Sequence, residues 1–82
     1  MSLEDDFRAA VARVNGLAAA PSSQVLLDLY GLYKQATAGD VDGARPGMMD
    51  FKGRAKYDAW ASRKGMSRDE AMRGYIAAAG RL

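Results

Sequence analysis

Apolar residues recur along most of this sequence at the spacing of an α-helix, and no stretch shows the sustained alternation of a β-strand. In the first segment Phe7, Val11 and Val14 fall four and then three positions apart, on one face of a helix. The second segment has so many apolar positions between Val25 and Ala36 that its helix is expected to touch two neighbours. The pattern therefore predicts an all-α fold without a sheet.

Capping residues and glycines divide this pattern into four helices. Ser2 is expected to cap the first helix, and Ser67 forms a Ser-x-x-Glu capping box with Glu70 at the start of the last. Gly39 is expected to end the second helix in a left-handed conformation. The predicted helices run from about Leu3 to Leu17, from Ser23 to Ala38, from Lys52 to Arg63, and from Ser67 to the last residue.

The connection between the second and third helices, Gly39 to Phe51, is long for so small a domain. We expect a turn at Arg45-Pro46-Gly47, because proline fixes one backbone torsion and glycine permits the next. The segment is also expected to pack against the domain, since four of its residues are apolar. These residues are Val41, Met48, Met49 and Phe51.

Length and composition limit the possible functions. Residues 1–82 suffice for one domain, and no apolar run approaches the roughly 20 residues needed to span a bilayer. Cysteine and histidine are both absent, which excludes disulfides, a thiolate nucleophile and the usual zinc ligands, and lowers the expectation of an enzyme. The acidic start does not resemble a secretory signal, so a cytoplasmic location is expected. No spare apolar stripe is evident, so we expect a monomer without stable membrane insertion.

The charge distribution is more informative than the net charge of +2, which is too balanced for a dedicated nucleic-acid binder. Lys52, Arg54 and Lys56 form a basic cluster. If the second and third helices face each other, Lys34 and Lys56 can meet one phosphate while Tyr33 offers a ring to a base. From the spacing alone, core tyrosines and solvated lysines are the favoured interpretation.

Two long strings carry a resemblance to a known family. They are Tyr30-Gly-Leu-Tyr-Lys-Gln-Ala-Thr-Ala-Gly-Asp40 and Arg45-Pro-Gly-Met-Met-Asp-Phe-Lys-Gly-Arg-Ala-Lys-Tyr-Asp-Ala-Trp60. With Gly65-x-Ser67-x-x-Glu70-Ala-Met-x-x-Tyr75-Ile76, they resemble the acyl-CoA-binding protein family, also called diazepam-binding inhibitor. The resemblance covers nearly the whole chain. It implies a single acyl-CoA-binding domain, folded as an up-down-down-up bundle of four helices.

The resemblance also implies a function. Such proteins bind medium- to long-chain fatty acyl-CoA esters inside cells, and transport or buffer them without catalysis, cofactor or metal. By position, Tyr30, Lys34 and Lys56 are expected to hold the ribose 3′-phosphate. Tyr33 is expected to stack on the adenine, and Tyr75 to close the nucleotide side. The residues expected to touch the acyl chain are Leu26, Leu27, Phe51 and Ala55.

This chain departs from the family pattern at two positions. Asn15 stands where relatives often have a basic residue, with Arg13 as the nearest substitute, so a headgroup contact from the first helix is not implied. Tyr57 replaces a tryptophan common in relatives. A helical protein-interaction module remains an alternative because of Met48 and Met49, whereas the acidic first helix argues against a nucleic-acid binder.

Overall fold

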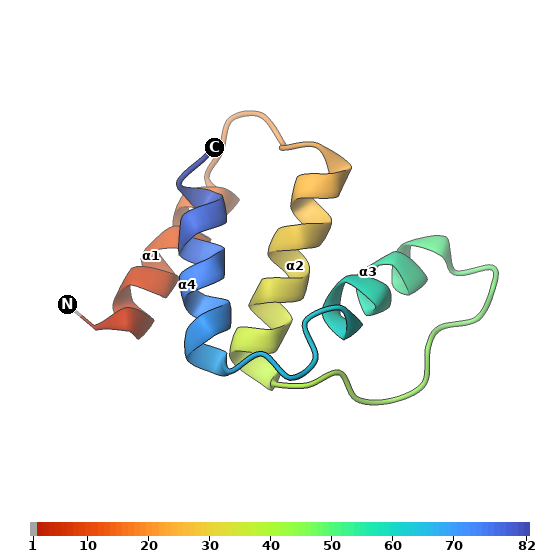
Figure 1. The fold of residues 1–82 in the computed structure, drawn as a ribbon. Helices are drawn as coiled ribbons and strands as arrows, with labels where there is room; N and C mark the ends of the chain where they lie inside the picture. Colours follow the sequence, from red (N-terminus) through yellow and green to blue (C-terminus); the bar gives the residue numbers. More distant parts are fainter. Residues whose placement is uncertain (1) are drawn as a thin grey trace.

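The computed structural model describes residues 2–82, and within this range the chain forms four helices and no strand (Figure 1). In chain order the helices run up, down, down and up, which confirms the predicted all-α four-helix fold. No helix in the described range has both the length and the apolarity needed to cross a membrane. The helices are α1 (Leu3–Asn15), α2 (Ser23–Ala38), α3 (Phe51–Ala61) and α4 (Arg68–Ala79).

The main helix contacts run in one order, from α1 to α4 to α2 to α3. α4 packs between α1 and α2, and α3 packs against α2 alone (Figure 1). The Cα atoms span 41 × 30 × 14 Å, so the molecule is flattened along one direction. The expectation that the second helix touches two neighbours is therefore correct, and the molecule has two broad faces.

Each helix begins at a side chain that accepts a hydrogen bond from a backbone N–H of the first turn. These bonds satisfy donors that the helix itself leaves unpaired. In α4 the bond is reciprocal, as the predicted capping box requires. The bonds run from Asp5 N to Ser2 Oγ (3.1 Å), Val25 N to Ser22 Oγ (3.3 Å), Gly53 N to Asp50 Oδ1 (3.0 Å) and Glu70 N to Ser67 Oγ (3.1 Å).

The helix ends differ from the prediction by a few residues. α1 ends at Asn15, α3 occupies Phe51–Ala61, and α4 ends at Ala79. Beyond each of these ends the backbone continues with N–H groups bonded three residues back, so the predicted extra residues form tighter turns instead. Gly39 has the expected positive φ of 84°, but its ψ of −152° lies outside the left-handed helical region.

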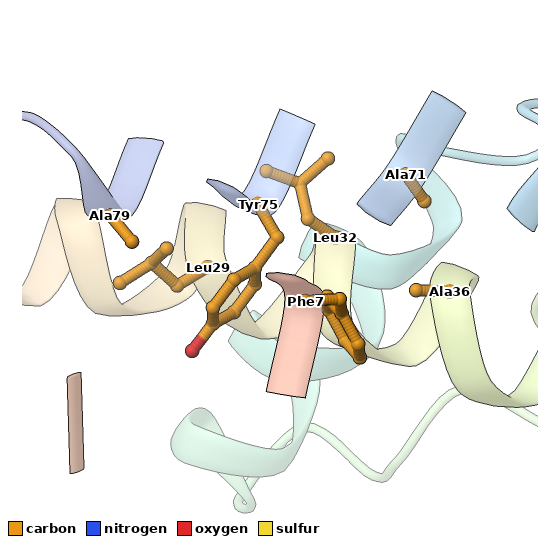
Figure 2. Close-up of a cluster of buried hydrophobic side chains, with 7 residues drawn as sticks. All are labelled: Phe7, Leu29, Leu32, Ala36, Ala71, Tyr75 and Ala79. Carbon is orange, nitrogen blue, oxygen red and sulfur yellow. The ribbon is translucent and has the colours of Figure 1, made fainter. Parts of the chain in front are cut away.

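The hydrophobic core joins α1, α2 and α4 (Figure 2). Side chains of α2 and α4 point towards each other, and Phe7 of α1 lies beside them. The rings of Phe7 and Tyr75 meet edge to face with centroids 5.2 Å apart, a favoured aromatic geometry. α3 has no fully buried residue. The core residues are Phe7, Leu29, Leu32, Ala36, Ala71, Tyr75 and Ala79.

α3 is held by a close backbone approach to α2 and by hydrogen bonds from its aromatic residues to the connection that follows α2. A Cβ at Gly31 would lie only 2.9 Å from the carbonyl carbon of Ala59, so only glycine allows the helices to cross this closely. The Trp60 indole donates to the Gly39 carbonyl (2.7 Å), and the Tyr57 hydroxyl donates to the Gly43 carbonyl (3.0 Å). Specific contacts therefore hold α3, without a buried apolar face.

The expectation that the connection between α2 and α3 packs down is wrong for most of its apolar residues. Met48, Met49 and Phe51 are 78%, 86% and 74% exposed, and only Val41 is half-buried. The connection bends around the outer end of α3, away from the core formed by the other helices (Figure 1). The predicted turn at residues 45–47 is also misplaced, because the observed turn closes between Gly47 O and Asp50 N (3.0 Å).

Candidate functional site

Two lysine–ring contacts link α2 and α3. The Lys34 ammonium lies 4.8 Å from the centre of the Trp60 ring, and the Lys56 ammonium lies 5.5 Å from the centre of the Tyr30 ring. Each helix thus supplies one lysine and one ring, four residues apart. Because α2 and α3 run in roughly the same direction, the two pairs meet in register. The structure brings Lys34 and Lys56 to one interface.

Both ammonium groups remain available for an anion. Within residues 2–82 neither lysine forms a salt bridge, and each faces only the negative π-surface of a ring. Such a contact is worth about 0.5–1 kcal/mol at an exposed site. A charge-assisted hydrogen bond to a phosphate is worth about 1.5–3 kcal/mol, so a phosphate can displace the ring as partner.

Phe7, Tyr33 and Tyr75 form an aromatic cluster between α1, α2 and α4. The Phe7 and Tyr33 rings stack with centroids 6.0 Å apart, and the Tyr33 and Tyr75 rings are 6.5 Å apart. Tyr33 is 39% exposed, whereas Tyr75 is 4% exposed. Burial, and to a lesser extent the neighbouring Tyr33, raises the pKa of the Tyr75 phenol, which therefore stays neutral at physiological pH. Tyr33 is the member of the cluster that an incoming ring can reach.

Three shallow hollows follow one another across the helix layer. The first, of about 500 Å³, lies between α1, α2 and α4 beside Phe7 and Tyr33. The second, of about 240 Å³, shares Val11, Asn15 and Tyr33 with the first. The third, of about 450 Å³, lies between the first turns of α2 and α3 and shares Leu26 with the second. The shared residues place each hollow next to the following one.

All but one of the site residues predicted from the sequence border at least one of the three hollows. Lys34 is the exception, since it borders none of the three hollows and faces Trp60 instead. The second hollow is bordered by Leu26, Tyr30, Tyr33 and Tyr75. The third is bordered by Leu26, Leu27, Phe51, Ala55 and Lys56.

Some lining residues escaped the sequence reasoning. Val11 and Asn15 of α1 border the first and second hollows, and their four-residue spacing is the signal that could have paired them. Trp60 was not among the predicted site residues, yet its ring contacts the Lys34 ammonium. Its position four residues after Lys56 mirrors the spacing of Tyr30 and Lys34. No cluster of three or more potential metal ligands occurs among residues 2–82.

Comparison with known proteins assigns this arrangement to a family. The model of the family described as "Acyl CoA binding protein" matches residues 4–79. This chain belongs to the acyl CoA binding protein family. The family assignment confirms the resemblance found in the sequence.

Members of the acyl CoA binding protein family from distant organisms are similar to this chain along most of their length. An acyl-CoA-binding protein from Brassica napus is 54% identical over 76 residues, covering 93% of this chain and 83% of that protein. An acyl-CoA-binding protein homolog from Manduca sexta is 50% identical over 78 residues, covering 94% and 87%. The crystal structure of acyl-CoA-binding protein 2 from Oryza sativa superposes with a TM-score of 0.93 at 41% identity, covering 98% and 87%.

Proposed function

We propose that this chain binds medium- to long-chain fatty acyl-CoA esters without altering them, and that residues 1–82 act as one binding domain. Membership of the acyl CoA binding protein family supports acyl-CoA binding, and it agrees with the prediction of a binding protein rather than an enzyme. The observation that carries the detailed proposal is the position of Lys34 and Lys56 at the same α2–α3 interface.

The nucleotide end of the ligand is proposed to bind between α2 and α3. Lys34 and Lys56 supply positive charge for the ribose 3′-phosphate, and Tyr30 lies beside the Lys56 ammonium. The exposed ring of Tyr33 offers a stacking surface for the adenine, worth about 1–3 kcal/mol. Tyr75 borders the same hollow as Tyr30 and Tyr33 and limits its depth.

The acyl chain is proposed to lie in the hollow between the first turns of α2 and α3. The apolar residues that border it are Leu26, Leu27, Phe51 and Ala55. Each buried CH₂ group contributes about 0.8 kcal/mol, so affinity is expected to rise with chain length until the hollow is filled. The protein is proposed to act as a cytoplasmic monomer that transports or buffers the ester, without cofactor and without a nucleic-acid partner.

Titration calorimetry of a long-chain acyl-CoA against its free fatty acid tests this division of the binding energy. The ester is expected to bind far more tightly, because the free acid lacks the nucleotide that the lysines and Tyr33 hold. Affinity for esters of increasing length is expected to rise and then level off. Equal affinity for ester and free acid contradicts the proposal.

Substitutions in the nucleotide part of the site give a second test. Tyr33→Ala is expected to weaken binding by about 1–3 kcal/mol through lost stacking. Lys34→Ala is expected to cost about as much and to reduce the salt dependence of binding, because one charge-assisted contact is lost. Lys64→Ala is a matched control, since Lys64 is exposed and belongs to neither lysine–ring pair of the α2–α3 interface. Folded variants of Tyr33 and Lys34 with unchanged affinity contradict the assignment.

A further inference from the structure

Three large apolar residues protrude together at the start of α3. We call Met48, Met49 and Phe51 the methionine tip. They are the most exposed large hydrophobic residues among those the structure describes, and they fall within four consecutive positions. Single exposed apolar residues are ordinary on protein surfaces, but a contiguous group of this kind indicates a contact surface.

The charges next to the methionine tip are mostly positive. Lys52, Arg54 and Lys56 follow it within one and a half turns of helix, against one acidic neighbour, Asp50, whose side chain caps the same helix. A protruding apolar group bordered by basic residues matches the interface of a bilayer with anionic lipids, where apolar side chains enter and basic side chains stay at the headgroups.

The methionine tip is also continuous with the hollow between α2 and α3. Phe51 belongs to both, because it is part of the exposed group and also borders the hollow with Leu26, Leu27 and Ala55. A ligand chain leaving this hollow on the side of Phe51 therefore passes one residue of the methionine tip. The proposed ligand is itself an amphiphile that partitions into membranes.

We propose that the methionine tip docks this chain, shallowly and reversibly, on an anionic lipid bilayer, with the hollow between α2 and α3 facing the lipid. A bilayer fits this surface better than a partner helix does. A partner helix needs a concave groove to receive its apolar face, whereas the tip is convex and consists of highly exposed side chains. The orientation of the hollow towards the lipid matters for a ligand only if the proposed function holds, but the docking itself does not rest on that function.

Co-sedimentation of the ligand-free protein with vesicles tests the docking. Vesicles of phosphatidylcholine and phosphatidylserine in equal amounts are expected to bind the protein, while pure phosphatidylcholine vesicles bind it weakly. The double variant Met48→Ser/Met49→Ser is expected to lose about tenfold or more in vesicle affinity. The matched control is Leu82→Ser, which removes an exposed leucine at the opposite end of the molecule (Figure 1). Equal vesicle binding by the double variant and the wild type overturns the proposal, as does failure of the wild type to bind.

A spin label gives the orientation of the bound protein. The chain contains no cysteine, so Met49→Cys and Leu82→Cys each provide a single labelling site. On anionic vesicles, the label at position 49 is expected to become accessible to oxygen and protected from a water-soluble relaxant, whereas the label at position 82 does not change. A label at position 49 that stays in water while the protein is bound overturns the proposed orientation.

Calorimetry in vesicle-free solution separates this inference from the proposed function. The Met48→Ser/Met49→Ser variant is expected to bind acyl-CoA with the affinity of the wild type, because neither methionine borders a hollow. Loss of vesicle binding with intact ligand affinity supports docking through the methionine tip. If the wild type binds vesicles but not acyl-CoA, the proposed function fails and the docking surface stands.

Discussion

The side of the molecule formed by α1, α2 and α4 and the side formed by α3 are stabilised in different ways. Among residues 2–82, the seven buried hydrophobic residues belong to α1, α2 and α4, whereas α3 has no buried residue. The first side is held by apolar packing. The second is held by directional contacts: the close approach at Gly31, the Trp60 hydrogen bond, and the two lysine–ring pairs.

This difference indicates which part of the molecule can unfold locally at the lowest free energy. Segments with few buried apolar contacts unfold locally at a lower free energy than the core, and α3 is such a segment. It also carries Lys56, half of the proposed lysine pair. A ligand held by Lys34 on α2 and Lys56 on α3 would therefore link the stable side to the weak one. Ligand binding is expected to stabilise α3 more than the other helices.

The largest effect is expected from the core side. Phe7→Ala removes the ring that contacts both Tyr33 and Tyr75, and truncation of a buried phenylalanine costs about 3–5 kcal/mol. In a domain of this size, such a loss is a large part of the total stability. Urea unfolding is expected to show a strongly lowered midpoint for all helices together. A variant that loosens α3 alone contradicts the division between the two sides.

A substitution at Gly31, where α2 and α3 cross, is expected to have the next largest effect. In Gly31→Ala the new methyl group collides with the backbone of Ala59, so α3 must move away from α2, at a cost of about 1–3 kcal/mol. Acyl-CoA affinity is expected to fall, because Lys34 and Lys56 separate. Gly74→Ala is the matched control on α4, where the new Cβ would lie 3.0 Å from the Leu32 Cδ2 atom, the end of a flexible side chain. Equal loss of affinity in the two variants contradicts this account.

The smallest effect is expected from pH, through Asp40. Its carboxylate accepts hydrogen bonds from the Gly65 N–H (2.9 Å) and the Gln35 amide (2.8 Å), and these bonds lower the pKa of Asp40. Because the folded-state pKa is the lower one, the stabilisation is present above the ordinary carboxyl pKa and is lost as pH falls through the lowered value. Thermal unfolding of Asp40→Asn is expected to depend less on pH than that of the wild type below about pH 4. Parallel pH profiles contradict this role.

The fold was predictable because its signals are local. Helix starts depend on a cap and the next three residues, so Ser2 and the pair of Ser67 and Glu70 could be read directly. At a helix end, a backbone N–H can bond to the carbonyl four residues back or three residues back, and the two differ little in energy. The predicted helix ends therefore differ from the observed ones by a few residues. The burial expected for Met48, Met49 and Phe51 failed for a different reason. A hydrophobic side chain is favoured inside the protein, but it becomes buried only where the fold provides an apolar surface for it to pack against.

The sequence could nominate residues for the candidate site, but it could not predict their geometry. The resemblance selected Tyr30, Lys34 and Lys56, and the structure brings them to one interface. Which ring each ammonium meets depends on the relative register of α2 and α3, and this is set by the close approach at Gly31. Periodicity within one helix contains no information about that register. The contact between Lys34 and Trp60 was therefore beyond sequence reasoning.

The ammonium over Trp60 gives the protein an intrinsic fluorescent reporter of the proposed nucleotide site. Trp60 is the only tryptophan in the chain, and a positive charge 4.8 Å from its ring shifts the emission of the indole. When a phosphate pairs with Lys34, that charge is partly neutralised and the emission wavelength changes. Occupancy of the nucleotide end can thus be followed in the unmodified protein by its ultraviolet emission alone.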